Sequence, residues 1–261
     1  MTQIDWRKIL HDLSDSIQSS VYTVLPQRGT MPVNRFKDLL DHQAQTAIIE
    51  YLTKYNIPVK LVSEEGNQTF GVGTHVITAD PVDGTSNLAR GLSPAVSSLS
   101  VSESDHQSGV FAGIVTNFYT GETFYAEKNQ RATLDGQPIR VAAPEKYSRA
   151  LISIDISKGP RLDRTRRLLK ESRHLRSEGC TAMSLCHVAS GTMDAHIDLR
   201  GIVRATDVSA GLLILGEAGG VHTVDGVLGG DFPLTRDTHM ELVAAGSTEL
   251  LDEINSLMGR P

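Results

Sequence analysis

The segment ITADPVDGTSN, residues 77–87, joins an apolar strand to two carboxylates and a turn of small residues. The strand runs into Asp80, and Pro81 then interrupts the hydrogen-bond ladder because it has no N–H group. Asp83 follows two residues after Pro81, so two carboxylates at one strand end can converge on one point. The Val82 carbonyl between them is freed from sheet pairing. Mg²⁺ prefers such oxygen ligands, together with water and phosphate oxygens. The segment therefore predicts a magnesium site.

The turn that follows Asp83 is suited to an anion. Glycine lacks a Cβ atom, so the backbone amides of Gly84 and Thr85 can approach a phosphate closely. The alternative is an ordinary Asp-Pro turn with local side-chain hydrogen bonds, which needs no ligand. The segment alone leaves both interpretations open.

Two further segments place carboxylates beside apolar elements. In SEEG, residues 63–66, the two acids follow an apolar strand and could simply mark a solvated strand end. In ATDVSAGLLILGEAGG, residues 205–220, Asp207 precedes an apolar helix, and helix capping alone would explain it. Each segment has a structural explanation, but no single structural explanation covers all three.

In this order the three segments resemble the motifs of the inositol monophosphatase superfamily: SEEG at 63–66, DPVDGTSN at 80–87 and ATDVSAGLLILGEAGG at 205–220. The resemblance spans most of the chain. It implies an α/β fold with a layered α+β organisation, the αβαβα sandwich of that family. It also implies hydrolysis of phosphate monoesters of small sugars or polyols, two or three Mg²⁺ ions, inhibition by Li⁺ and a homodimer.

The resemblance assigns the metal ligands residue by residue. Glu64, Asp80 and the Val82 carbonyl match one metal site, and Asp80, Asp83 and Asp207 match a second. The neighbouring acid Glu65 is expected to support these ligands rather than bind a metal.

The resemblance also assigns the residues that act on the phosphate and the attacking water. Asp41, on a preceding helix, matches an acid that pairs with Thr85, and this pair together with Glu64 would orient and deprotonate the water. Asp38, three residues earlier on the same helix face, competes with Asp41 for this role. The phosphate would lie against Asp83 and the amides of Gly84 and Thr85.

The rest of the substrate is expected to meet a second set of residues. RSEGCT, residues 176–181, resembles a family segment that contacts the substrate, which makes Arg176 and Thr181 candidates. Arg200 lies seven residues before Asp207, where inositol-selective members carry a glutamate. Because guanidinium suits phosphate, Arg200 is expected to bind a second phosphate. The resemblance is then to archaeal-type dual enzymes acting on fructose 1,6-bisphosphate and inositol monophosphate. The alternative is a solvated arginine on a strand edge.

Other polar residues are expected to be structural. His187, His196 and His222 lie in predicted elements without metal-ligand spacing. The basic segment 161–170 is expected to be a solvated helix face, with substrate contact as the alternative. Cys180 and Cys186 lie in one predicted helix, a geometry too poor for a disulfide.

Apolar spacing predicts the order of the elements. Two amphipathic helices come first, beginning at residues 6 and 39, and strands then dominate up to residue 141. After a break at 142–148, strands and helices alternate. We expect an α+β half at 1–145 that binds metal, and an α/β half at 146–261 that completes the active site. The predicted strands are 59–63, 75–80, 96–103, 109–118, 122–127, 139–141, 150–156, 194–199, 221–224 and 241–245, and the later helices are 162–172, 181–190, 207–218 and 248–258.

Composition narrows the function further. The net charge of −6 gives no overall basic field for nucleic acid or an anionic membrane. No apolar run approaches the roughly 18 residues that a membrane span needs, and the first residues lack the apolar core of a signal peptide, so a cytoplasmic location is expected. Aromatic residues make up only 5%, which argues against the adenine-binding alternatives, adenosine bisphosphate and NADP phosphatases. A regulatory protein of the same fold with a macromolecular partner is the alternative from another class, and the full carboxylate set argues against it.

Overall fold

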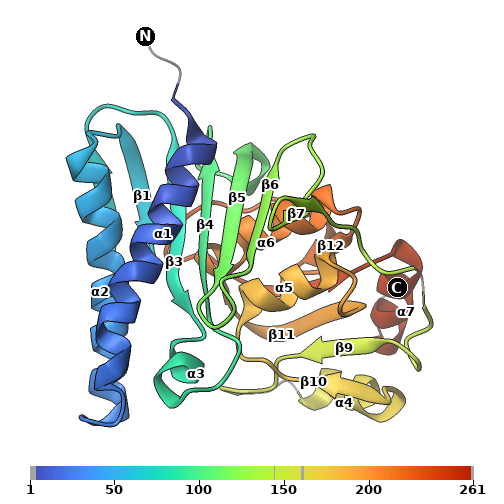
Figure 1. Cartoon of the computed structure of the whole chain (residues 1–261). Helices are drawn as coiled ribbons and strands as arrows, with labels where there is room; N and C mark the ends of the chain where they lie inside the picture. The colour runs from blue at the N-terminus through green and yellow to red at the C-terminus, as the bar shows by residue number, and fades with distance from the viewer. Residues whose placement is uncertain (1–3, 144, 160–161, 260–261) are drawn as a thin grey trace.

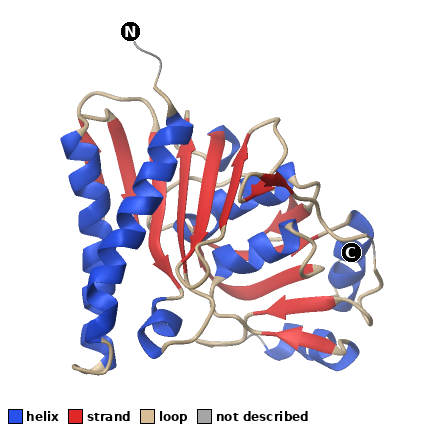
Figure 2. Cartoon of the chain, in the orientation of Figure 1, coloured by secondary structure: helices blue, strands red, loops and turns tan. Residues whose placement is uncertain are grey.

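The computed structural model of the chain describes residues 4–143, 145–159 and 162–259. Within these ranges the elements form five layers in the order helices, sheet, helices, sheet, helices (Figures 1 and 2). The layered α/β sandwich predicted from the resemblance is confirmed. No helix in the described ranges has the length and apolarity that crossing a bilayer requires.

The first layer is a pair of helices, α1 (Trp6–Val24) and α2 (Val33–Lys54). Apolar side chains recur on α1 every three or four residues, and Leu10, Leu13 and Ile17 are completely buried. They pack with α2 and the neighbouring sheet in one hydrophobic core. Both amphipathic helices predicted from the sequence are confirmed.

The second layer is a mixed eight-stranded sheet in which β1 and β3 run parallel and the other neighbours are antiparallel. Helices cover both faces of its centre, so β3 and β4 are buried almost throughout. Pro81 lies where the register between these two strands shifts, between Asp80 and Asp83, as the sequence predicts. The strand order is β2 (Gln68–Phe70), β1 (Val59–Ser63), β3 (Val76–Asp83), β4 (Val96–Ser102), β5 (Val110–Asn117), β6 (Thr123–Glu127), β7 (Thr133–Leu134) and β8 (Gln137–Pro138).

The third layer holds α5 (Thr181–Ala189) and α6 (Ala205–Glu217) between the two sheets. Two glycines allow the backbones to approach. A Cβ on Gly113 of β5 would lie 3.0 Å from Ala210 Cα, and one on Gly211 would lie 2.8 Å from Leu185 of α5. The close packing fixes the start of α6, and with it Asp207, against the first sheet.

The fourth and fifth layers are a six-stranded sheet and the helices on its outer face. Leu168 of α4 and Ile254 of α7 are buried against this sheet in a third core. The strand order is β10 (His174–Arg176), β9 (Leu151–Ile154), β11 (Ala195–Arg204), β14 (His239–Ala245), β12 (Val221–Val224) and β13 (Val227–Leu228), and the helices are α4 (Leu162–Glu171) and α7 (Thr248–Leu257).

The structure departs from the sequence predictions at a few short elements. The strand expected at 139–141 is wrong. The tight turn at Asp135 and Gly136, both with positive φ, instead joins β7 to β8. The apolar side chains of Ile139 and Val141 pack against the hydrophobic core that lies between the two sheets. Their N–H groups donate to Ala132 O and Ala218 O outside any strand. Elements that the sequence did not predict are β2, β7, β8, β10, β13, the short helix α3 (Thr85–Arg90), and the 3₁₀ turns η1 (Leu25–Gln27) and η2 (Gln107–Gly109).

The two sheets separate along the chain between residues 138 and 151, near the predicted break. The hydrophobic core between the two sheets nevertheless contains Val115 and Phe124 of the first sheet together with Leu242 and Ala244 of the second. Division into halves at 1–145 and 146–261 stays a prediction.

Candidate active site

A cavity of about 630 Å³ opens where the carboxyl ends of β1 and β3 meet the first turns of α5 and α6. Every site residue predicted from the sequence lines it except Arg176. The predicted residues on its wall are Asp41, Glu64, Asp80, Val82, Asp83, Gly84, Thr85, Thr181, Arg200 and Asp207.

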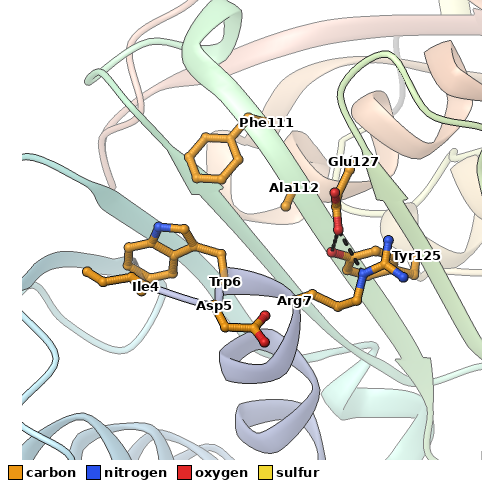
Figure 3. Close-up of a pocket in the computed structure, with 8 residues that line it drawn as sticks. All are labelled: Ile4, Asp5, Trp6, Arg7, Phe111, Ala112, Tyr125 and Glu127. Carbon is orange, nitrogen blue, oxygen red and sulfur yellow. Dashed lines mark hydrogen bonds and ion pairs between the residues drawn. The ribbon is translucent and has the colours of Figure 1, made fainter. Parts of the chain in front are cut away.

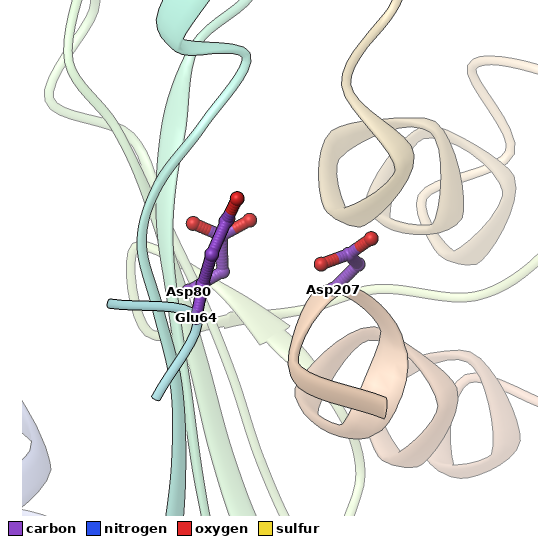
Figure 4. A group of neighbouring side chains, drawn as sticks. All are labelled: Glu64, Asp80 and Asp207. Carbon is purple, nitrogen blue, oxygen red and sulfur yellow. The ribbon is translucent and has the colours of Figure 1, made fainter. Parts of the chain in front are cut away.

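Three carboxylates converge at the base of the cavity. Glu64, Asp80 and Asp207 each offer an oxygen, and these oxygens lie within 4.8 Å of one another. Figure 4 shows Glu64 and Asp80 on one side and Asp207 facing them from α6. The fold thus brings together acids that are more than 140 positions apart in the sequence.

Asp80 shows that this cluster fits a cation. Its Oδ1 accepts a hydrogen bond from Val82 N at 3.1 Å, whereas its buried Oδ2 has no hydrogen-bond partner among the described residues. Burial raises the pKa of Asp80 well above its ordinary value, and the charges of Glu64, Asp83 and Asp207 raise it further. A buried, unpartnered carboxylate oxygen is costly. A hard divalent ion such as Mg²⁺, which takes carboxylate oxygens, would satisfy it.

Asp83 lies beside this cluster and is held by α5. Its Oδ2 accepts a hydrogen bond from Ala182 N at 2.7 Å, in the first turn of that helix. Burial and the charge of Asp207 raise its pKa to about 7. Asp83 therefore ties the metal-binding strand to the helix that begins at Thr181.

The predicted Asp41–Thr85 pair is present. Thr85 Oγ1 lies 3.0 Å from Asp41 Oδ1 and 2.8 Å from the Val82 carbonyl oxygen, so its single hydroxyl proton can be donated to either acceptor. Burial raises the pKa of Asp41 to about 7, and the charges of Glu65 and Glu64 add to the effect. A carboxylate with such a pKa can exchange a proton near neutrality. Asp38, the competing acid, is exposed and does not line the cavity.

Gly84 occupies a position that only glycine fits well. Its φ is +83°, and a Cβ atom there would lie 2.9 Å from the Pro94 carbonyl oxygen. The missing side chain leaves the backbone of the Gly84–Thr85 turn open to the cavity.

Arg200 lines the cavity, but the protein already uses its donors. Nε and Nη2 donate to the two oxygens of Asp198 at 2.9 and 2.5 Å, and Nη2 also lies 3.1 Å from Asp155 Oδ2. Nη1 lies 2.9 Å from Ser157 Oγ and 3.2 Å from the Ser157 carbonyl. Four hydrogen bonds and the ion pair with Asp155 therefore engage all three nitrogen atoms of the guanidinium. Binding a second phosphate would require Arg200 to exchange some of these bonds.

Arg176 lies outside the cavity. It belongs to the edge strand β10, is exposed, and donates to the adjacent Leu175 carbonyl at 2.9 Å. Residues after it in the same segment, Ser177, Glu178 and Gly179, line the cavity instead. The side chain of an edge-strand residue points according to the strand's alternation, which the motif alone did not reveal.

Arg204 is the main functional residue that the sequence analysis missed. Its Nε lies 3.0 Å from Asp207 Oδ1, its Nη1 forms an ion pair with Glu64, and its Nη2 lies 4.0 Å from Asp80. Its place three residues before Asp207, at the strand–helix junction, was the signal available. Other residues on the wall that the sequence analysis did not identify are Lys37, Ser86, Asn87, Asp155, Ser157, Lys158, Ser177, Glu178, Gly179, Ile202, Val203 and His239.

Several of the other polar residues named from the sequence have partners of their own, although the buried Nε2 of His196 has no hydrogen-bond partner among the described residues. His187 Nδ1 lies 3.1 Å from Glu178, and His196 is buried with Nδ1 3.1 Å from Ser153 Oγ. On the basic helix, Arg164 pairs with Glu241, and none of its described residues lines the cavity. Arg161 lies outside the described residues. Cys180 and Cys186 are free thiols.

A second cavity, of about 530 Å³, lies at the N-terminal end of α1, at the opposite end of the first sheet from α3 (Figures 1 and 3). Glu127 accepts hydrogen bonds from Arg7 at 2.8 Å and from the Tyr125 hydroxyl at 2.6 Å. These three polar side chains therefore pair with one another on the wall of this cavity.

Comparison with known proteins identifies the family of this chain. The inositol monophosphatase family matches residues 26–256. A fructose-1,6-bisphosphatase/inositol-1-monophosphatase of Methanothermobacter thermautotrophicus is 34% identical over 230 residues, covering 83% of this chain and 81% of that protein. One of Archaeoglobus fulgidus is 30% identical over 254 residues, covering 94% and 95%. A crystal structure named inositol monophosphatase–fructose 1,6-bisphosphatase superposes with a TM-score of 0.83 at 25% identity, covering 97% and 100%. Its relatives are named as phosphatases, which are phosphoric monoester hydrolases. The chain belongs to the inositol monophosphatase family.

Proposed function

We propose that this protein hydrolyses fructose 1,6-bisphosphate and inositol 1-phosphate with the help of two or three Mg²⁺ ions. The observation that carries the proposal is the buried cluster of Glu64, Asp80 and Asp207, with an unpartnered Asp80 oxygen at the base of an open cavity. The names of the archaeal relatives support this choice of substrates. Sensitivity to Li⁺, a homodimeric state and a cytoplasmic location belong to the same proposal and rest on the family resemblance.

The carboxylates would hold the metal and Thr85 would handle the attacking water. Bound Mg²⁺ would activate that water and offset the charge of the phosphate and the leaving alkoxide. Thr85 Oγ1 would accept a hydrogen bond from the water while its own proton is directed to Asp41 Oδ1, 3.0 Å away. Glu64 would orient the water from the other side. The Gly84–Thr85 backbone would hold the phosphate in line, so that no side chain needs to attack it.

The cavity wall beyond the carboxylate cluster suits a phosphorylated polyol. Its volume of about 630 Å³ falls within the roughly 300–1,000 Å³ typical of small-molecule sites. Asp155 and Glu178 present carboxylates that can accept hydrogen bonds from hydroxyl groups. Lys158 and Lys37 line the same wall, and their ammonium groups have no ion-pair partner among the described side chains. Since Arg200 is engaged by the protein, Lys158 is the better candidate to meet a second phosphate.

The proposal is tested by phosphate release from a panel of substrates with Mg²⁺ and with EDTA. We expect Mg²⁺-dependent release from fructose 1,6-bisphosphate and inositol 1-phosphate, and much slower release from adenosine 3′,5′-bisphosphate and NADP⁺. Preference for the adenine nucleotides would overturn the substrate assignment. Release of phosphate from none of the four would favour the regulatory alternative.

A further inference from the structure

Arg204 occupies the position where a divalent cation would be expected to bind. It is the last residue of β11, and its side chain reaches back over the first turn of α6. Its guanidinium contacts Glu64 and Asp207 directly, and its Nη2 lies 4.0 Å from Asp80 Oδ2, so it faces all three members of the carboxylate cluster. Arginine stays protonated at every pH at which proteins are folded. In the metal-free protein it therefore provides the positive charge that three converging carboxylates require.

A metal ion would bind the same carboxylate oxygens that this guanidinium contacts. Arg204 Nη1 pairs with Glu64 Oε1, and Nε lies 3.0 Å from Asp207 Oδ1 and 3.3 Å from Oδ2. A Mg²⁺ ion coordinates carboxylate oxygens at about 2.1 Å. Such an ion would bring a second positive charge into the space that the guanidinium fills. Both cations cannot occupy the cluster together.

The side chain has room to leave. It is 29% exposed, and every hydrogen bond and ion pair recorded for it in the described structure ends on the cluster. The backbone contact is separate, because Asp207 Oδ2 accepts from the Arg204 N–H at 3.1 Å whatever the side chain does. The start of α6 can therefore persist while the guanidinium moves.

The neighbouring Arg200 shows that this arrangement is particular to Arg204. Both arginines lie on β11, but Arg200 is bound to Asp198 and Asp155, which are not in the cluster. Its side chain is only 9% exposed and donates hydrogen bonds to Asp198 and Ser157. Arg200 is held in place, whereas Arg204 is held only by the acids that a metal would take.

We propose that Arg204 is a built-in competitor of the metal: its guanidinium offsets part of the negative charge of Glu64, Asp80 and Asp207 in the metal-free protein, and metal binding displaces it. The competition weakens metal affinity and stabilises the empty site. This inference rests on the proposed metal dependence, and Arg204 acts as a positioning residue rather than a catalytic one.

The test is the binding of Mn²⁺ alone, without substrate, to the full chain. Free Mn²⁺ is measured by electron paramagnetic resonance for wild type, Arg204→Met and Arg204→Lys. Arg164→Met serves as the control, since Arg164 is another partly buried, ion-paired arginine, 20% exposed and away from the cavity. We expect Arg204→Met to bind Mn²⁺ at least about tenfold more tightly, because a competing ion pair has been removed. The Mn²⁺ affinity of Arg204→Lys should lie between those of wild type and Arg204→Met, and the Mn²⁺ affinity of Arg164→Met should match that of wild type.

Thermal unfolding in EDTA gives an independent readout. Arg204→Met should melt below wild type without metal and gain more in Tm when Mn²⁺ is added. If Arg204→Met does not fold, the test uses the nuclear magnetic resonance signal of the Arg204 Nε–H proton in the wild type. Comparison with the spectrum of Arg204→Lys assigns that signal. Addition of Mg²⁺ should then speed solvent exchange of that proton and leave Arg164 unchanged.

The outcomes separate the two proposals. If wild type binds no Mn²⁺, the proposed metal site itself is wrong. If wild type binds Mn²⁺ and Arg204→Met binds it equally or more weakly, only the competition is overturned. An Arg204 Nε–H that stays protected in saturating Mg²⁺ would overturn it as well.

Discussion

The Thr85 hydroxyl donates a hydrogen bond to Asp41 Oδ1 across 3.0 Å and 44 positions of sequence. This bond connects α2 of the first layer to the turn that follows the metal-binding strand. The same proton can instead be donated to the Val82 carbonyl oxygen, so one hydroxyl links the acid to a predicted metal ligand. The pair thus faces the same cavity as the carboxylate cluster.

Replacing either member of this pair should affect turnover more than metal binding. Asp41→Asn and Thr85→Ala should each lower kcat by about 10²-fold or more, because the proton acceptor or its link to the water is lost. The Mn²⁺ affinity should change little, since neither side chain belongs to the carboxylate cluster. Asp38→Asn is the matched control on the same helix and should be silent. A damaging Asp38→Asn with a silent Asp41→Asn would show that the wrong acid has been assigned.

The metal-free protein should gain stability when Asp41 loses its charge. Burial raises the pKa of Asp41 to about 7, with Glu65 and Glu64 adding to the effect, against roughly 3.9 when unfolded. Between these values the folded state keeps the proton and the unfolded state loses it, so the stability contributed by Asp41 falls as pH rises from about 4 to 7. Asn has no such loss. In EDTA the Tm of Asp41→Asn should therefore exceed that of wild type at pH 8 and approach it at pH 4. Equal Tm values at pH 8 would contradict the raised pKa.

Asp83→Asn should separate metal binding from the fold. The amide oxygen can still accept the hydrogen bond from Ala182 N, so the start of α5 should persist and the circular dichroism spectrum should be unchanged. One negative charge near Asp207 is lost, and phosphate release should fall by about 10²-fold or more. A variant that hydrolyses monoesters at near wild-type rates would remove Asp83 from the metal site.

Arg200 and Lys158 should affect the two substrates differently. The guanidinium of Arg200 is bound to Asp198, Asp155 and Ser157 within the protein. Arg200→Met should therefore lower kcat/KM on both substrates alike. Lys158→Ala should lower kcat/KM about tenfold on fructose 1,6-bisphosphate and spare inositol 1-phosphate, which has no second phosphate. A selective loss in Arg200→Met would restore the role first predicted for it from the sequence, and equal losses in Lys158→Ala would end the role given to Lys158.

Much of this site could be predicted because its residues lie in local patterns. The Pro81 break, the Gly84 turn and the capping position of Asp207 each leave a signal within a few neighbouring residues. The order of most helices and strands followed from apolar periodicity, which reports burial directly, whereas the five-layer sandwich was implied by the family resemblance. The same rule failed at 139–141, where burial comes from loop packing rather than strand pairing.

The parts that could not be predicted depend on contacts between distant segments. Arg200 and Arg204 are alike in sequence, four residues apart on one strand. Only the fold sets Asp155 and Ser157 against the first and Glu64 against the second. Arg176 likewise belongs to a suggestive motif, but its edge strand carries its side chain away from the cavity.

The central claim is that the carboxylate cluster holds the metal on which hydrolysis depends. Phosphate release from fructose 1,6-bisphosphate and inositol 1-phosphate, followed as Mg²⁺ is added back to EDTA-treated wild type and Asp80→Asn, tests it most directly. Wild type should be inactive in EDTA and recover fully with Mg²⁺, while Asp80→Asn should stay at least about 10²-fold lower at saturating Mg²⁺. Activity that persists in EDTA, or an Asp80→Asn variant as active as wild type, would contradict the account.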